Sequence, residues 1–289
     1  MKAYMFPGQG SQARGMGALL FDRFADLAAR AEQILGYSVR DLCLNDPNGQ
    51  LKQTLYTQPA VYVVNAFAYF NKIAASGREP DYLLGHSLGE LNALLAAGCF
   101  DFELGLRIVQ HRAELMSQSP AGAMAAVMNV GAERIGRVLR NHGLNQIDLA
   151  NYNTPSQIVI SGAADEITRA EEIFTDAGHR CCLLNTSGAF HSRLMRPAQE
   201  RFQAYLSGIE LANPKIPVIA NVTARPYGAS QVRTHLAAQI TSTVRWFESI
   251  QYLREIGSAT GENVEFEETG HGEVLAKLLH SIDTAGRTN

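Results

Sequence analysis

The stretch PDYLLGHSLGELNALLAAG, residues 80–98, decides the fold class. It begins with an apolar run typical of a buried strand and continues into an apolar helical segment that Gly98 closes. Between the two lies GHSLG, residues 85–89, which fits the pattern G-x-S-x-G. On such a strand-to-helix turn a serine is held in a strained conformation with its hydroxyl exposed, and the glycines let neighbouring backbone approach. Ser87 is therefore a candidate nucleophile; the alternative is a glycine-rich turn with an idle serine.

Strand-like and helix-like segments alternate around this stretch. Residues 3–10, AYMFPGQG, are typical of a short buried strand that ends in a turn, and residues 15–36 predict one helix. Thr57 is expected to cap the next helix, with Pro59 in its first turn, where a missing N–H costs nothing. That helix is apolar on nearly all sides and should be buried. The alternation of strand and helix predicts an α/β architecture with a mostly parallel sheet.

The pattern changes between about residues 124 and 187. The order there is a strand, a helix, two strands joined by a turn, a second helix and a last strand, which is expected over residues 179–187. This βαββαβ order is that of a ferredoxin-like unit. Because the unit lies inside the chain rather than at an end, we interpret it as an insertion into the α/β domain.

The composition excludes several classes of function. The chain has 289 residues, of which 46% are hydrophobic and 18% charged, as in a folded globular enzyme. Its net charge of −3 gives no broad positive field, so we expect no nucleic-acid partner. No apolar run is long enough for a membrane span and the start is not a signal peptide, so we expect a cytoplasmic protein with no membrane partner. The four cysteines lack metal-ligand or redox spacing, and neither a metal site nor a cofactor is predicted.

A serine nucleophile needs a base, and eight histidines are available. His86 adjoins the serine but is expected to point elsewhere, because neighbours on a tight turn diverge. His191, in SGAFHSRLM at residues 187–195, follows a strand and opens a helix, a position from which side chains reach a cleft in α/β folds. It is the candidate base; the alternative is a structural histidine in a turn. A solvated or capping role is the default for the histidines in polar helix-like settings, His111, His142, His235 and His280.

Several short motifs together resemble those of one family. They are FPGQGSQ at 6–12, TQPA at 57–60, GHSLGE at 85–90, Arg112 with Met116, AFHS at 189–192 and VRW at 244–246. In this order and spacing they resemble the malonyl-CoA:acyl carrier protein transacylases and the acyltransferase domains of polyketide synthases, over nearly the whole chain. The resemblance implies an α/β-hydrolase-like parallel-sheet domain, residues 1–122 and 189–289, with an inserted ferredoxin-like βαββαβ subdomain, residues 123–188.

The resemblance also implies a catalytic set. Ser87 is expected to carry the acyl group as an ester, and His191 to take the serine proton and return it to the leaving thiol. The backbone N–H groups of Gln9 and Leu88 are expected to form the oxyanion hole. Gln239 is expected to orient the histidine through its backbone carbonyl, so that no triad aspartate is required.

Arg112 has two interpretations. Residues 102–117 predict an amphipathic helix, and on sequence alone Arg112 is an arginine that snorkels past apolar neighbours. The resemblance instead implies a bidentate pair with the free carboxylate of a malonyl group. It also implies that Met116, Phe190 and Gln58 line the substrate pocket. The bulk of Phe190 is expected to disfavour an α-methyl group on the substrate.

The reaction implied by the resemblance moves a malonyl group from malonyl-CoA to the phosphopantetheine thiol of an acyl carrier protein. Residues 221–226, NVTARP, favour the discrete acyltransferases that serve polyketide synthases in trans over the fatty-acid enzyme, which stays an alternative. Two competing interpretations are a hydrolase on the same serine and histidine and a catalytically silent docking module. Arg112 argues against a hydrolase of neutral acyl groups, because these have no carboxylate to hold. The chain departs from the family at residues 270–272, Gly-His-Gly where Gly-Pro-Gly is common.

Overall fold

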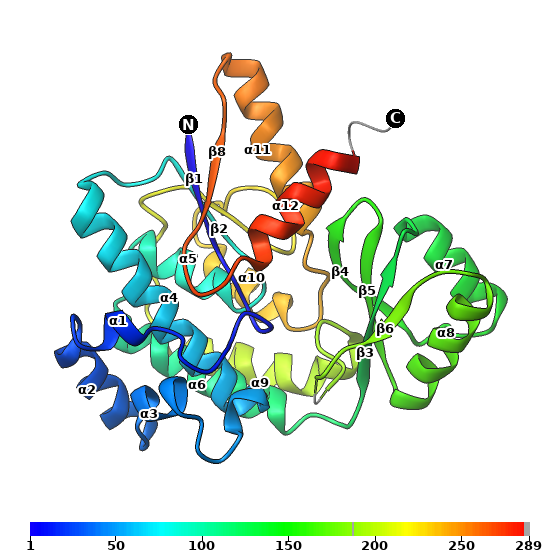
Figure 1. Ribbon diagram of the computed structural model, residues 1–289, viewed down its shortest axis with the longest axis horizontal. Coiled ribbons are helices and arrows are strands. Elements are labelled where there is room, and N and C mark those ends of the chain that lie inside the picture. The colour runs from blue at the N-terminus through cyan, green and yellow to red at the C-terminus, as the bar shows by residue number, and fades with distance from the viewer. Residues whose placement is uncertain (187, 286–289) are drawn as a thin grey trace.

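The computed structural model describes residues 1–186 and 188–285, which form two four-stranded sheets (Figure 1). The strands of the first sheet are β1 (Lys2–Phe6), β2 (Tyr82–Gly85), β7 (Val218–Ile219) and β8 (Glu265–Glu268). Their order is β7-β2-β1-β8, and every pairing is parallel. The predicted parallel sheet is therefore confirmed.

The parallel sheet is buried because its central strands are apolar on both faces. Residues 3–6 of β1 and Leu83 and Leu84 of β2 are at most 1% exposed, as expected for strands that helices cover on both sides. The helices outside the insert are α1 (Ala18–Phe21), α2 (Ala25–Leu35), α3 (Val39–Leu44), α4 (Thr54–Ser76), α5 (Gly89–Ala96), α6 (Phe102–Ser117), α9 (Arg196–Ser207), α10 (Val232–Gln239), α11 (Trp246–Thr260) and α12 (Val274–Ala285), with short 3-10 turns at Gln50–Lys52 and Arg193–Met195.

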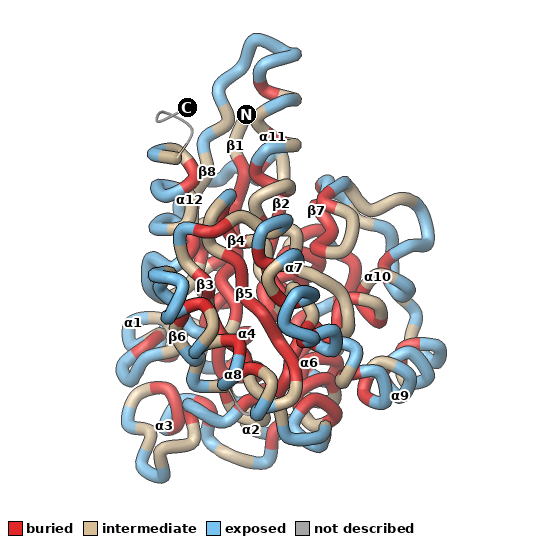
Figure 2. Tube along the Cα trace, turned by 90° about the vertical axis from the view of Figure 1, so that its right-hand side faces the viewer, coloured by how far each residue is buried: buried red, intermediate tan, exposed pale blue. Residues whose placement is uncertain are grey.

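Helix α4 crosses the interior, and residues 57–67 of it are all buried, so the prediction of a buried helix is confirmed. Figure 2 shows how the buried trace concentrates inside a shell of exposed turns and helix ends. Among the described residues, no helix combines the length and apolar character that a membrane crossing requires.

Two helix boundaries differ from prediction. Thr57 does not cap α4, because the helix begins at Thr54 and its N-cap is Gln53, the residue after the 3-10 turn at Gln50–Lys52. The Thr57 hydroxyl donates to the carbonyl of Leu51 at 2.6 Å instead of accepting from a backbone N–H. Residues 15–36 form α1 and α2 rather than one helix. The break lets α1 pack against α4 while α2 packs against α6.

The second sheet is antiparallel and belongs to the inserted unit. In chain order the unit is β3 (Ala123–Met128), α7 (Ala132–Asn141), β4 (Asp148–Thr154), β5 (Gln157–Gly162), α8 (Ala164–Asp176) and β6 (Cys181–Leu183). The strands are arranged β4-β5-β3-β6, and the predicted ferredoxin-like fold is confirmed. Helices α7 and α8 lie together on the face away from the parallel sheet (Figure 1), over a core that includes Ile135, Ile160 and Phe174.

The last strand of the insert is shorter than predicted. It covers Cys181–Leu183 instead of residues 179–187, because it is an edge strand that pairs only with β3. Ser187 lies outside the described residues. At the opposite edge, Tyr152 N donates to the Val244 carbonyl and Val244 N donates to the Ala150 carbonyl, both at 2.9 Å. These bonds join the two sheet systems, and the domain boundaries 1–122, 123–188 and 189–289 stay a prediction.

Gly89→Ala is expected to destabilise the fold. A Cβ at Gly89 would lie 2.0 Å from the carbonyl oxygen of Phe6, so α5 must move away from β1. Overpacking of this kind costs about 1–3 kcal/mol, which urea denaturation measures. Gly136→Ala in α7 is the control, because its Cβ would meet only the end of the Arg140 side chain; it should gain up to about 1 kcal/mol. An unchanged midpoint for Gly89→Ala would contradict the close approach.

Candidate active site

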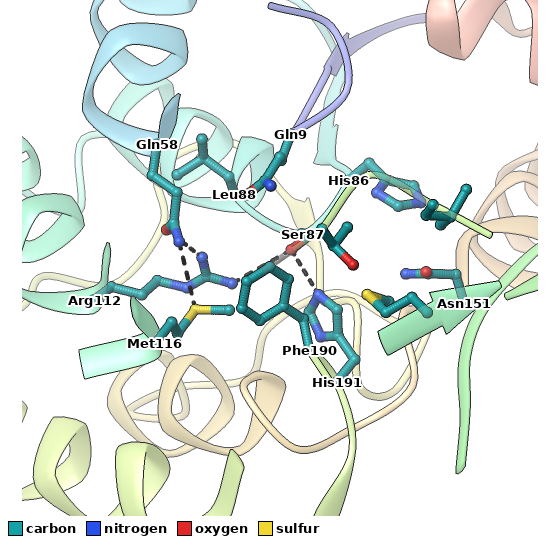
Figure 3. A pocket seen from close by; sticks show the side chains of 13 residues that line it. Gln9, Gln58, His86, Ser87, Leu88, Arg112, Met116, Asn151, Phe190 and His191 are labelled. Carbon is teal, nitrogen blue, oxygen red and sulfur yellow. Dashed lines mark hydrogen bonds between the residues drawn. The ribbon is translucent and has the colours of Figure 1, made fainter. Parts of the chain in front are cut away.

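Ser87 lies on the junction of β2 and α5. Its backbone φ is +51°, in the left-handed region that residues other than glycine rarely adopt, as expected for a nucleophile on a strained turn. The turn is very tight, since a Cβ at Gly85 would lie 2.0 Å from the carbonyl carbon of Gly89. The serine lines a cavity between the two sheet systems (Figure 3).

Two side chains from distant segments hold the Ser87 backbone in this conformation. The N–H of Ser87 donates to Asn221 Oδ1 at 2.8 Å, and its carbonyl accepts from Gln239 Nε2 at 2.9 Å. Asn221 is itself fixed to the turn, since its Nδ2 donates to the Gly85 carbonyl at 2.7 Å. Sequence reasoning missed the role of Asn221, because no spacing in the chain indicates a contact between this loop and the turn.

His191 reaches the serine from the segment before α9. Its Nε2 lies 2.7 Å from Ser87 Oγ, and its Nδ1 lies 2.8 Å from the backbone carbonyl of Gln239. A carbonyl can only accept, so we assign the ring proton to Nδ1, which leaves Nε2 to accept from the serine hydroxyl. Burial, and then the charge of Arg112, lower the pKa of His191 to about 3. The imidazole is therefore neutral at neutral pH and able to take a proton.

The adjacent histidine faces away from the serine hydroxyl, as predicted. His86 Nε2 lies 2.8 Å from Asn153 Oδ1, and its ring centroid lies 5.6 Å from that of Trp246. Asn153 belongs to β4, so this contact ties the nucleophile turn to the insert. The cavity is not lined by the histidines predicted to be solvated or capping, His111, His142, His235 and His280.

Arg112 does not snorkel to solvent, so the interpretation from sequence alone is wrong. Its side chain is 1% exposed, because the stripe of α6 that carries it faces the cavity (Figure 3). Nη1 donates to Gln58 Oε1, and Nη2 donates to Gln239 Oε1 at 2.8 Å and to Ser87 Oγ at 3.3 Å. Burial lowers the pKa of Arg112 to about 10, so the guanidinium remains charged at neutral pH. Its buried Nε has no hydrogen-bond partner among the residues described.

Two backbone N–H groups beside Ser87 have no hydrogen-bond acceptor in the described part of the chain. Within residues 1–186 and 188–285, neither the N–H of Gln9 nor that of Leu88 donates a hydrogen bond. The two lie in adjoining backbone, because a Cβ at Gly8 would be 2.3 Å from the His86 carbonyl oxygen and 3.5 Å from Leu88 N. Free donors at the start of a helix suit a negative charge that develops on a substrate oxygen.

Nearly all of the site residues predicted from the sequence line this cavity. Its lining comprises Gln9, Gln58, His86, Ser87, Leu88, Arg112, Met116, Met124, Asn151, Leu184, Thr186, Phe190 and His191. Gln239 is the one nominated residue outside this lining, and its contacts place it behind the serine and the histidine. Sequence reasoning missed the wall from the insert, which supplies Met124, Asn151, Leu184 and Thr186. Asn151 lies in β4, and the sequence pattern there predicts a strand of the insert but gives no sign of a place in the site.

A serine, a neutral histidine, two free donors and a buried arginine in one cavity are an acyl-transfer arrangement, and comparison with known proteins agrees. A family model described as "Acyl transferase domain" matches residues 3–282. The chain belongs to the acyl transferase family. The "Polyketide biosynthesis malonyl CoA-acyl carrier protein transacylase BaeC" of Bacillus velezensis is 49% identical over 98% of this chain and 96% of its own length.

Two further acyl transferases span a similar range. The "Malonyl CoA-acyl carrier protein transacylase" of Synechocystis is 38% identical over 96% of this chain and 92% of its own length. A crystal structure of the malonyl CoA-acyl carrier protein transacylase from Burkholderia pseudomallei superposes with a TM-score of 0.96 at 58% identity, covering 98% of both chains. This acyl transferase is therefore a member of the malonyl CoA-acyl carrier protein transacylase group.

The departure of this acyl transferase from Gly-Pro-Gly affects the loop against the first motif. A Cβ at Gly270 would lie 2.2 Å from Asn65 Oδ1 and 2.8 Å from Pro7 Cγ, so the glycine is required there. His271 takes the position of the proline and is half-buried. It does not line the cavity that contains Ser87, and the contacts of the serine, histidine and arginine do not involve it.

Proposed function

We propose that this acyl transferase moves a malonyl group from malonyl-CoA to the phosphopantetheine thiol of an acyl carrier protein, through an ester on Ser87. The observation that carries the proposal is the buried charge of Arg112, whose Nη2 lies 3.3 Å from Ser87 Oγ. The buried carboxyl of Glu90 offsets part of the cost of this charge but is connected to it only through Gln239. The planar fork of arginine matches a carboxylate as a direct partner. An acyl group that ends in a carboxylate supplies that partner at the required place.

The first half-reaction forms the ester. His191 Nε2 takes the proton of Ser87 Oγ as that oxygen attacks the thioester carbonyl carbon. The carbonyl oxygen becomes an oxyanion, which the N–H groups of Gln9 and Leu88 stabilise. The carbon–sulfur bond then breaks, the proton passes from His191 to the coenzyme A sulfur, and the malonyl ester remains on the serine.

The second half-reaction uses the same groups in the opposite direction. The carrier thiol gives its proton to His191 as its sulfur attacks the ester carbonyl carbon. The bond from that carbon to Ser87 Oγ breaks, and the serine oxygen recovers the proton. In both halves the Gln239 carbonyl accepts a hydrogen bond from the Nδ1–H, at 2.8 Å, and stabilises the imidazolium, as the carboxylate of a triad does elsewhere.

The acyl pocket favours malonyl over methylmalonyl. Phe190 and Met116 line the cavity, and the bulk of Phe190 is expected to disfavour an α-methyl group on the substrate. Gln58 donates toward Met116 Sδ at 3.6 Å and accepts from Arg112, which fixes the polar end of the pocket. One methyl group is worth only about 1–3 kcal/mol in such a pocket, so the selectivity is a preference rather than an exclusion.

We also propose that the enzyme serves a polyketide synthase in trans, in the cytoplasm. The relative named for polyketide biosynthesis is more similar in sequence than the cyanobacterial transacylase, which supports this role over fatty-acid synthesis. The four cysteines are free thiols, buried or half-buried, which agrees with a reducing compartment.

Arg112→Ala is expected to lower the ratio of malonyl to acetyl transfer by about 10²-fold, since hydrogen bonds to a charged group are worth about 1.5–3 kcal/mol each. The malonyl carboxylate then enters the cavity without a partner, whereas an acetyl group has no charge to compensate. The ratio is measured as transfer from each coenzyme A thioester to a carrier protein.

Arg107→Ala provides the control, because Arg107 is an exposed arginine of the same helix. It should keep the wild-type ratio. If both transfers fall together in Arg112→Ala, the arginine is structural and the malonyl assignment loses its main support. If thiol is released over many turnovers without carrier protein, beyond the one equivalent that accompanies ester formation, the enzyme is a hydrolase.

A further inference from the structure

A buried carboxylate lies directly behind the nucleophile turn. Glu90 is in the first turn of α5 and is 1% exposed. It does not line the cavity and takes no part in the proposed transfer steps. Because a buried carboxylate is costly unless hydrogen bonds and charges compensate, its partners show what it holds in place.

Each carboxylate oxygen of Glu90 accepts from groups that support the site. Oε1 accepts from the backbone N–H of Asn221 and from the hydroxyl of Tyr227, both at 2.8 Å. Oε2 accepts from Gln239 Nε2. Asn221 and Gln239 are the side chains that hold the two peptide groups of Ser87. Both anchors of the nucleophile therefore converge on this one carboxylate.

Gln239 extends this connection to the other reactive groups. Its backbone carbonyl accepts from His191 Nδ1, and its Oε1 accepts from Arg112 Nη2, both at 2.8 Å. An amide can turn over and exchange the positions of its nitrogen and oxygen. Because a carboxylate only accepts, Glu90 draws the nitrogen of Gln239 toward itself and leaves the oxygen facing the arginine.

We propose that Glu90 is a positioning residue for malonyl transfer, which holds the nucleophile, the base and the carboxylate-binding arginine in one arrangement through Gln239 and Asn221. This inference rests on the proposed function, because malonyl-CoA is the substrate only if that function is correct. Glu90→Gln keeps the shape of the side chain but turns one acceptor into a donor. If the new N–H donor faces Gln239, the Gln239 amide must turn its oxygen toward residue 90 and away from Arg112. If the new donor faces Asn221, two N–H groups oppose each other.

Protonation of Glu90 acts on the same contacts, because one oxygen becomes a donor and the negative charge to which Gln239 and Asn221 donate is lost. Burial raises the pKa of Glu90 to about 7, against the lowering effect of its hydrogen bonds and of Arg112. The titratable and charged groups that face it are Tyr227, from the segment after β7, and Arg112, from α6; His191 is connected only through Gln239. A raised carboxyl pKa means that the folded state binds the proton more tightly than the unfolded state, so the free energy of unfolding falls as pH rises from the ordinary carboxyl pKa of 4.5 to about 7. Activity rises with pH through about 7, because the carboxylate form holds the site.

The test compares the wild type with Glu90→Gln and Tyr227→Phe. Tyr227→Phe is the matched control, because it removes one buried hydrogen bond to the same carboxylate. Both oxygens of Glu90 can still accept from Asn221 and Gln239. Malonyl-CoA is the first acyl donor, followed as the malonyl ester by rapid quench and intact mass. The second is p-nitrophenyl acetate, followed as the burst of p-nitrophenol, which needs the serine and histidine but no carboxylate site.

Glu90→Gln is expected to slow malonylation by about 10²-fold, as for a reactive group displaced by a distant change, and acetylation by a smaller factor. Tyr227→Phe is expected to slow either reaction by less than about tenfold. In the wild type, malonylation should rise with pH through about 7 while Tm falls relative to Glu90→Gln. A residue that only stabilises the fold would move activity and Tm in the same direction.

Wild-type malonylation in Glu90→Gln, or equal losses in the two variants, overturn the inference. If circular dichroism shows that Glu90→Gln does not fold, the pH dependence of malonylation by the wild type decides instead. A rate that stays constant between about pH 6 and about pH 8 overturns the inference. If the wild type takes no malonyl group from malonyl-CoA, the proposed function fails, and the p-nitrophenyl acetate comparison still decides the role of Glu90.

Discussion

Ser87→Ala is expected to abolish the malonyl ester and to slow transfer by about 10⁶-fold, the usual loss when a serine nucleophile is removed. The substitution deletes the oxygen that lies 2.7 Å from His191 Nε2. It leaves the backbone of the turn in place, because Asn221 and Gln239 hold the peptide groups rather than the hydroxyl. Intact mass after incubation with malonyl-CoA measures the ester, and labelled transfer to a carrier protein measures the rate.

Ser161→Ala is the matched control for the loss of a buried hydroxyl. Ser161 is fully buried in β5, and its Oγ has no hydrogen-bond partner in the described part of the chain. Ester yield and transfer rate should stay at wild-type levels. A wild-type yield of ester in Ser87→Ala, or a malonylated peptide that lacks residue 87 in the wild type, would contradict the assignment of the nucleophile.

His191→Ala is expected to slow acylation by roughly 10²–10⁴-fold, the range for loss of positioned proton transfer. Ser87 Oγ then has no base within reach, and the leaving thiolate has no proton donor. Because the pKa of His191 is about 3, its own protonation does not limit the wild-type rate near neutral pH. Rapid-quench measurement of ester formation at neutral pH therefore reports the loss of the base itself.

His86→Asn separates the base from its neighbour. His86 faces Asn153 and the ring of Trp246, so its replacement removes a contact with the insert but no proton acceptor of the serine. The loss of rate should be far smaller than for His191→Ala. The reverse order of the two losses would assign the base to His86.

Local sequence rules were sufficient where neighbours along the chain decide the structure. The turn at Ser87 follows from glycines that admit close backbone contact, and β1 and β2 follow from short apolar runs. The rules failed where distant partners decide. Residues 15–36 carry one helical periodicity but form α1 and α2, because each packs against a different helix. Periodicity specifies which face is buried, not how many neighbours bury it.

The same limit applies to the site. The amphipathic pattern of α6 puts Arg112 among apolar residues, and that pattern does not distinguish a stripe facing solvent from one facing a cavity. The family resemblance predicts a role for Arg112 in the substrate site, and the structure places Arg112 in the cavity lining; its pairing with a substrate carboxylate stays a prediction. Glu90, in the first turn of α5, looks in sequence like an ordinary complement to the helix dipole. Its contacts with Asn221 and Gln239 involve segments far along the chain, and only the folded arrangement reveals them.

In the proposed mechanism one serine–histidine pair, 2.7 Å apart, serves both half-reactions, and this has a consequence for metabolic direction. The donor and the product are both alkyl thioesters of malonate, so nearly the same bond is broken and formed. An enzyme of this kind has almost no thermodynamic gradient of its own. It equilibrates two pools of thioester, and malonyl groups flow toward whichever pool is being drained. Net flux is then governed by the chain-extending reaction that consumes the loaded carrier, and the transacylase keeps that supply replenished without committing it.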